Sequence, residues 1–191
     1  SFNDFFSRKL KSADQRPIAA PDDNSVVASP CDSEPQGVWA VDDQSYIGSS
    51  EKIAVESRVF NSVRNLIGED SPYCDAFAGG KFYHAFLNVN DYHRYHFPLD
   101  GTIKEIRVIP GDDALGGTIT WEPELQQYVV DCSVPGWQSI ETRGLVILDT
   151  EAYGLVAVMP IGMSQVASVN FEPELQVGTK VKKGDMLGYF L

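Results

Sequence analysis

The sequence has few cysteines and few basic residues, and both shortages limit what the protein can be. The three cysteines, Cys31, Cys74 and Cys132, cannot all pair, and there is no CxxC motif. Neither a disulfide framework nor a structural zinc site is therefore expected. Lysine and arginine number 15 against 27 aspartates and glutamates, a net charge of −12 at pH 7. Because a surface this acidic repels phosphate backbones, we expect no nucleic-acid partner.

Long apolar runs are also missing. The longest, Gly154 to Met163, is about half of the roughly 20 residues that a membrane-spanning helix needs. The first six residues lack the basic start and the apolar core of a signal peptide. Together with the cysteine usage, these features predict a cytoplasmic protein. The first residue is serine, which suggests a trimmed or processed product.

What the chain does contain is a series of short alternating apolar and polar runs, typical of strands. Helical spacing of apolar residues predicts an amphipathic helix over residues 1–10 and a second helix over about 54–66. We therefore expect an α+β fold, with a mostly antiparallel β core and short N-terminal helices. A length of 191 residues is near that of one domain, so residues 1–191 are expected to form a single domain. The predicted strands cover residues 25–29, 37–41, 81–89, 91–98, 101–108, 127–130, 144–149, 155–160 and 165–169.

A weak internal duplication links residues 98–112 with residues 177–188. Both segments combine glycine turns with alternating Val, Ile and Leu, since glycine tolerates the positive φ of tight turns. The pattern resembles the barrel-sandwich hybrids of biotinyl and lipoyl domains. No Met-Lys-Met or Asp-Lys-Ala tripeptide is present to carry such a group. A non-catalytic carrier or binding module of this shape is nevertheless one alternative function.

All three histidines fall within 13 positions: His84, His93 and His96. His93 and His96 are three residues apart, so on a strand their rings point to opposite faces and have different tasks. No third ligand has the spacing of a zinc site, and no metal is expected. His84 either lines a pocket or is a buried core residue, and the sequence leaves both alternatives open.

Residues 91–101, D-Y-H-R-Y-H-F-P-L-D-G, resemble the "D-Y-H-R-x-H-x-P-x-x-G" signature of the phosphatidylserine decarboxylase family. Other segments agree with that family in the same order, so that the similarity spans essentially the whole chain. One departure is Ser33, which stands where the family has glycine. The agreeing segments are 5–10 with 16–18 (F-F-S-R-K-L and R-P-I), 29–32 (S-P-C-D), 77–80 (F-A-G-G) and 181–190 (V-K-K-G-D-M-L-G-Y-F).

The resemblance implies a processed, pyruvoyl-dependent enzyme. Family members cut themselves between a glycine and a serine just beyond the last of these segments, and the serine becomes a pyruvoyl group on the smaller α chain. The present sequence stops at Gly188-Tyr189-Phe190-Leu191, within a strand-like run. It therefore looks like the β chain, and the strand is expected to continue in its own α chain. We expect a homo-oligomer of αβ units.

The resemblance also assigns roles to individual residues. His96 and Asp32 match the histidine and aspartate that perform self-cleavage together with a serine on the α chain, in a Ser-His-Asp arrangement. His93 matches the histidine that handles protons during decarboxylation, for which an imidazole suits because its pKa lies near neutrality. Two structural alternatives stay open: Asp32 as a turn residue after Pro30, and His93 as a ring bonded to the backbone.

The segment Ile161-Gly162-Met163-Ser164, with residues 86–89, resembles the soluble branch of the family, which includes fungal L-tryptophan decarboxylases. We therefore expect release of CO₂ from a free aromatic or apolar L-amino acid such as tryptophan. The alternative is phosphatidylserine, with peripheral membrane contact in that case. The net charge of −12 opposes approach to an anionic leaflet. Candidate substrate-binding residues are Phe82, His84, Phe86, Met163 and Ser164.

Overall fold

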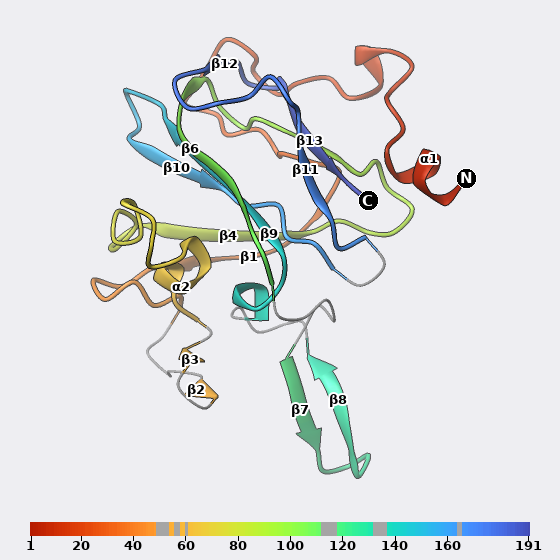
Figure 1. Ribbon diagram of the computed structural model, residues 1–191, viewed down its shortest axis with the longest axis vertical. Coiled ribbons are helices and arrows are strands. Elements are labelled where there is room, and N and C mark those ends of the chain that lie inside the picture. The colour runs from red at the N-terminus through yellow and green to blue at the C-terminus, as the bar shows by residue number, and fades with distance from the viewer. Residues whose placement is uncertain (49–53, 56–57, 60, 112–117, 132–136, 164–165) are drawn as a thin grey trace.

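The computed structural model describes the chain except for residues 49–53, 56–57, 60, 112–117, 132–136 and 164–165 (Figure 1). All strand pairs in the described part are antiparallel. The elements are α1 (Phe2–Phe6), a 3-10 turn (Ala13–Gln15), β1 (Glu34–Ala40), β2 (Ala54–Val55), β3 (Arg58–Val59), α2 (Val63–Ile67), β4 (Lys81–Phe86), β5 (Arg94–His96), β6 (Gly101–Ile109), β7 (Thr118–Glu122), β8 (Gln127–Asp131), a 3-10 turn (Trp137–Ser139), β9 (Arg143–Asp149), β10 (Leu155–Val158), β11 (Val169–Phe171), β12 (Lys180–Val181) and β13 (Met186–Phe190).

The main sheet has four strands in the order β10-β9-β6-β12. Strand β9 is buried on both faces, because side chains alternate along a strand and a core cluster packs against each face. Val146 and Leu148 belong to the first cluster, with Tyr95, Phe97 and Leu187 among others. Leu145 and Ile147 belong to the second, with the apolar side of α2. The two cores of the molecule therefore meet at β9.

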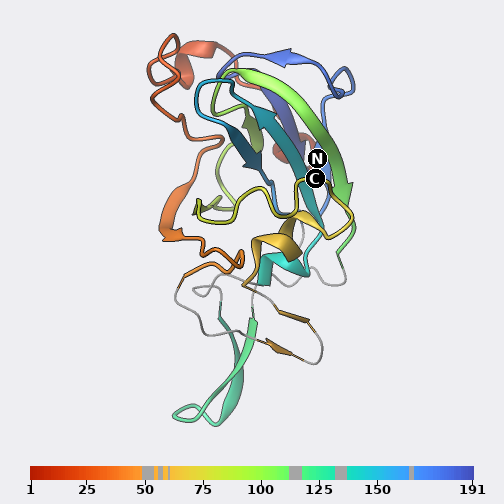
Figure 2. The ribbon, with the colours of Figure 1, turned by 90° about the vertical axis from the view of Figure 1, so that its left-hand side faces the viewer.

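A second sheet, in the order β11-β13-β5, carries the last strand of the chain in its centre. Figures 1 and 2 show that α1 and the C-terminal end of β13 lie on the same side of the molecule. Strands β1 and β4 form a separate pair, and β7 and β8 form a hairpin that projects away from the sheets in both views. The predicted α+β class with a mostly antiparallel β core is confirmed.

The predicted helix over residues 54–66 is wrong in its first half. Ala54–Val55 pairs with Arg58–Val59 as two short antiparallel strands, and the helix is confined to Val63–Ile67. β-branched residues such as Val55 and Val59 favour strands, whereas the apolar residues of α2 recur at helical spacing and are buried. The turn at Gly68, with a φ of 93°, ends the helix.

The N-terminal prediction is right in kind but too long. Helix α1 covers only Phe2–Phe6; it begins with a capping box between Ser1 and Asp4 and ends at Ser7. The predicted strand at residues 25–29 is irregular and is held through a backbone hydrogen bond from Ala28 to Pro98. No helix in the described part of the chain has the length and apolar character needed to cross a membrane.

A buried lysine fastens this irregular N-terminal segment to the β core. The Nζ atom of Lys183 donates to the carbonyl oxygens of Ala20 (2.8 Å), Asp23 (2.6 Å) and Val26 (2.6 Å). Only 4% of the Lys183 surface is exposed. Three acceptors around one ammonium group satisfy all of its donors, so the charge is buried with its hydrogen bonds made.

We expect Lys183→Met to lower the free energy of unfolding by about 3 kcal/mol, because three hydrogen bonds to a buried charged group are lost. Urea denaturation of the full protein measures the change. Lys180→Met is the matched control, since Lys180 is exposed and its replacement is expected to cost no more than about 0.5 kcal/mol. An equal loss of unfolding free energy in the two variants would contradict this role of Lys183.

Candidate functional site

His93 and His96 lie beside the end of the chain. His96 is the last residue of β5 and pairs with Met186 of β13, while His93 directly precedes β5. The backbone nitrogen of Phe190 donates to the carbonyl oxygen of His93 at 3.0 Å. The sheet register therefore fixes both histidines along the final strand, His93 at its C-terminal end and His96 at its start.

His93 is buried in an aromatic environment, with 2% of its surface exposed. The edge of Phe6 meets its ring at 4.6 Å between centroids, and Phe190 lies at 6.5 Å on an edge-on approach. The Nδ1 atom is 3.0 Å from the carbonyl oxygen of Asp91. Because a carbonyl oxygen only accepts hydrogen bonds, Nδ1 carries the hydrogen and the neutral ring presents a basic Nε2.

Burial is also the main reason that the pKa of His93 is lowered from its ordinary value. The hydrogen bond to the carbonyl of Asp91 acts in the opposite direction, and the positive charge of Arg8 lowers the pKa further. Burial and the charge of Arg8 both lower the pKa, so they favour the neutral imidazole at pH 7. His93 is thus prepared to accept a proton at Nε2.

His96 is anchored in the same manner by a different carbonyl. Its Nδ1 donates to the carbonyl oxygen of Gly184 at 2.8 Å, so that Nε2 is again the basic nitrogen. The ring lies 5.9 Å from that of Tyr92 and is half-buried. Within the described residues, neither His93 nor His96 has a hydrogen-bond partner at Nε2.

The carbonyl of Gly184 belongs to a tightly held turn between β12 and β13. The backbone nitrogens of Lys183 and Gly184 donate to Asp100 (2.8 Å) and to the carbonyl of Phe97 (2.8 Å). Gly184 has a φ of 88°, and a Cβ atom there would lie 2.1 Å from Ile18. The positive φ favours glycine here, which explains the glycine of the K-G-D sequence.

The backbone segment that contains Asp32 lies beside His96. The carbonyl oxygen of Pro30 accepts a hydrogen bond from the backbone nitrogen of His96 at 2.7 Å. The carboxylate, however, is paired with Arg16, whose Nε lies 2.6 and 2.8 Å from its two oxygens. This pairing raises the pKa of Arg16. The carboxylate thus binds Arg16, and the acceptor at Nδ1 of His96 is the Gly184 carbonyl.

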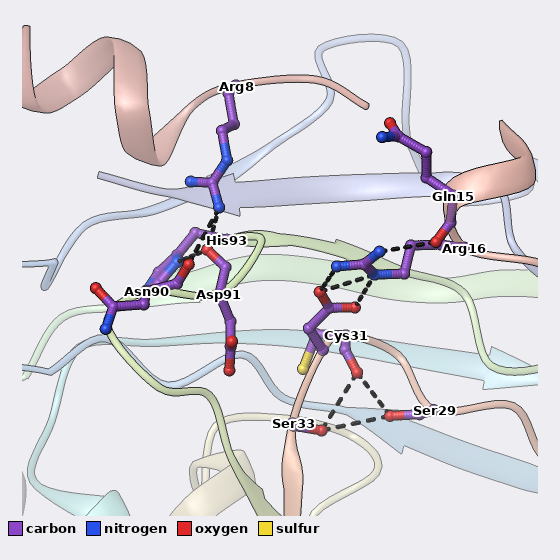
Figure 3. Close-up of polar contacts among 10 residues, drawn as sticks. Arg8, Gln15, Arg16, Ser29, Cys31, Ser33, Asn90, Asp91 and His93 are labelled. Carbon is purple, nitrogen blue, oxygen red and sulfur yellow. Dashed lines mark hydrogen bonds and ion pairs between the residues drawn. The ribbon is translucent and has the colours of Figure 1, made fainter. Parts of the chain in front are cut away.

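Figure 3 shows the surroundings of His93 and of the Asp32 segment side by side. Arg8 lies above Asp91 and His93, and Arg16 lies beside Cys31. Sequence reasoning identified the histidines and Asp32 but not Arg8, Arg16 or Gly184 as their partners. The motifs F-F-S-R, R-P-I and K-G-D contain all three residues. Their roles gave no sequence signal, because two of the three contacts are made with backbone carbonyls.

The substrate-binding candidates of β4 lie near the second core cluster. Phe82 packs against that cluster and stands 6.0 Å from the ring of Trp39. His84 stacks on Phe82 at 6.4 Å and lies 3.4 Å from the amide of Gln138, and burial lowers its pKa. Phe86 is half-buried where β4 pairs with Glu34.

The remaining two candidates are Met163 and Ser164. Met163 is half-buried and forms an isolated bridge with Val166, a residue that packs against the first core cluster. Ser164 lies outside the described residues. Within the part of the chain that is described, no group of three or more His, Cys, Asp or Glu side chains is placed to hold a metal ion.

The chain is similar along its full length to a known protein family and to several named decarboxylases. The phosphatidylserine decarboxylase family model matches residues 2–191. Decarboxylase iboD of Amanita muscaria is 30% identical over 100% of this chain and 55% of its own length. Phosphatidylserine decarboxylase proenzyme 2 of Oryza sativa is 32% identical over 100% of this chain and 27% of its own length.

A bacterial relative, the phosphatidylserine decarboxylase proenzyme of Saccharophagus degradans, is 34% identical over 88% of this chain and 52% of its own length. The chain therefore spans about half, or less, of the length of these curated relatives. The match of the family model to residues 2–191 nevertheless covers the histidine segment and the final strand together. The chain belongs to the phosphatidylserine decarboxylase family.

Proposed function

We propose that residues 1–191 are the β-chain domain of a pyruvoyl-dependent decarboxylase, completed by an α chain cut from the same precursor. One observation carries the proposal: β13 pairs with β5 and bonds to His93, so that the K-G-D-M-L-G-Y-F segment lies against both histidines of the motif. Both rings carry their hydrogen on Nδ1 and keep a basic Nε2. A carrier module requires neither feature, and family membership also argues against it.

In the self-cleavage step, His96 is the proposed base. A serine on the residues that follow Leu191 in the precursor would lose its hydroxyl proton to Nε2 of His96, as the serine of a Ser-His pair does. Leu191 itself is held by backbone hydrogen bonds to Ser168. His93 and His96 are three residues apart, about 10 Å along a strand. The proposal therefore requires a serine of the α chain to lie near β5.

A pyruvoyl group supplies a ketone that condenses with a substrate amine and draws electrons away as CO₂ leaves. The residues of this chain fit such a group, because the chemistry needs a nearby proton carrier and His93 has a free basic nitrogen. Nε2 of His93 would accept the proton that the substrate ammonium releases and would supply a proton to the substrate carbon after CO₂ has left. The surrounding rings of Phe6 and Phe190 keep water from competing.

For the substrate, we propose a free aromatic or apolar L-amino acid such as tryptophan. Met163 in the I-G-M-S segment supports this choice, since a polarizable side chain suits an indole or apolar group. The net charge of −12 disfavours an anionic membrane surface. Phosphatidylserine is the alternative: relatives are named for it, Phe2 and Phe5 are exposed, and Arg8 lies over the Phe5 ring.

We expect His96→Ala to leave the precursor uncleaved, because the serine hydroxyl loses its base. Asp32→Asn is expected to slow cleavage less severely, since it changes charge without removing the base. Gel electrophoresis of the purified precursor follows both. His84→Ala is the control and is expected to cleave normally. Complete processing of the His96 variant would reject the assignment, and an uncleaved His93→Ala protein beside it would transfer the role to His93.

His93→Ala is expected to self-cleave but to decarboxylate at least about a hundredfold more slowly, the usual contribution of general acid–base catalysis. Intact mass of the α chain shows whether the pyruvoyl group has formed, and release of labelled CO₂ gives the rate. Lys180→Met serves as the control, because Lys180 is exposed and is not among the candidate site residues. A cleaved, pyruvoyl-bearing His93 variant with unchanged turnover would remove His93 from the chemistry.

The substrate is tested by CO₂ release from labelled tryptophan, phenylalanine, methionine and serine, alongside phosphatidylserine in detergent. We expect turnover of tryptophan or another apolar amino acid and little with the lipid. Met163→Ala is expected to raise KM for the preferred amino acid more than it lowers kcat. Turnover of phosphatidylserine without any of the free amino acids would replace the proposed substrate with the lipid.

A further inference from the structure

The carbonyl oxygen of Asp91 has two donors, and they come from distant parts of the chain. Nδ1 of His93 lies 3.0 Å from it, and Nη2 of Arg8 lies 2.7 Å from it. A carbonyl oxygen has two lone pairs, so both donors are accommodated and the peptide unit of Asp91 is fixed between them. Figure 3 shows Arg8 reaching this carbonyl from the N-terminal segment, directly over His93.

Arg8 is itself held in place by further contacts. Its Nη1 donates to the carbonyl oxygen of Phe5 at 2.6 Å, and its guanidinium lies 4.0 Å from the centre of the Phe5 ring. Arg94, of which 6% is exposed, donates to the carbonyl oxygens of Ser7 and Arg8 at 2.7–3.2 Å. The residue next to His93 thus ties the backbone of Arg8 to β5.

We propose that Arg8 is a positioning residue for His93. By holding the Asp91 carbonyl, it fixes the hydrogen of His93 on Nδ1 and leaves Nε2 as the single basic nitrogen. The consequence for catalysis rests on the proposed function, in which Nε2 of His93 carries the proton. The structural claim concerns only Arg8, Asp91 and His93.

Charge adds a second effect in the same direction. A guanidinium beside an imidazole disfavours the imidazolium, and Arg8 lowers the pKa of His93. The side chain of Asp91 acts oppositely and more weakly. These are the two charged groups that act on His93 in the described structure, since the rings of Phe6 and Phe190 are uncharged. Removal of the Arg8 charge therefore raises the pKa of His93.

The test uses the full processed protein, with its histidines labelled with ¹⁵N. The chain contributes three imidazoles. Their signals are assigned with the His84→Gln and His96→Gln variants. The His96→Gln variant is measured as the precursor, because it is expected not to cleave. NMR titration then gives the midpoint of His93 and the nitrogen that carries its hydrogen. The variants are Arg8→Gln and Arg8→Lys. Lys9→Gln is the matched control, because Lys9 is exposed, adjacent and not among the charges that act on His93.

In Arg8→Gln we expect the titration midpoint of His93 to move to higher pH and the ring to populate both neutral tautomers. Arg8→Lys is expected to restore the midpoint, and Lys9→Gln to leave it unchanged. The signals of His84 and His96 report whether the fold is intact. Equal midpoints in wild-type and Arg8→Gln proteins, or equal shifts in Arg8→Gln and Lys9→Gln, would overturn the proposal.

A measurement on the wild-type protein covers the case in which Arg8→Gln does not fold. Salt screens charges that are partly exposed, and Arg8 acts on His93 more strongly than the Asp91 charge does. Screening of the net charge of −12 lowers the pKa of each histidine, so the midpoint of His93 is expected to fall less with salt concentration than that of His84, whose pKa is lowered by burial. A midpoint of His93 that falls as much as that of His84 would count against the role of Arg8.

The two proposals fail in different ways. A wild-type protein that shows the expected His93 titration but releases no CO₂ from any substrate would overturn the proposed function and leave the Arg8 assignment standing. An active protein whose acid limb in kcat/KM is the same with and without Arg8 would overturn the Arg8 assignment alone. In the supporting case, the acid limb of Arg8→Gln moves to higher pH together with the NMR midpoint.

Discussion

The pairing of β13 with β5 is the interaction on which the site depends. It sets His96 opposite Met186 and joins the backbone of Phe190 to that of His93. The register shifts between Met186 and Gly188, and a Cβ atom at Gly188 would lie 2.0 Å from the carbonyl of Asn170. Glycine is therefore required where β13 passes between its two neighbours. Without this close approach, the end of the sequence would not meet the histidines.

Cations inside the molecule bind mostly to backbone carbonyls. Lys183 holds residues 20–26, Arg94 holds Ser7, and Arg8 holds Asp91, in each case across more than 80 positions of sequence. The N-terminal segment has little regular structure of its own, so that these contacts take the place of strand pairing. In a chain with a net charge of −12, the few basic residues thus join the N-terminal segment to the site.

The sequence was most informative where side chains alone decide the structure. Strand-like apolar residues predicted strands at 101–108 and 144–149, which correspond to β6 and β9. Residues 54–59 misled because their apolar spacing suits a helix while their β-branched side chains favour strands. The hydrogen bonds of Arg8 to the Asp91 carbonyl and of His96 to the Gly184 carbonyl had no pattern to reveal them, since an acceptor carbonyl is present at every residue.

Asp32 illustrates how a motif locates a residue without fixing its partner. Its segment lies against His96, yet its carboxylate binds Arg16, and the Gly184 carbonyl takes the Nδ1 hydrogen of His96. A carbonyl orients an imidazole but brings no full negative charge to stabilise the imidazolium. The carboxylate that the motif supplies is paired with Arg16 in this arrangement, so the motif alone does not predict which group would stabilise a charged His96.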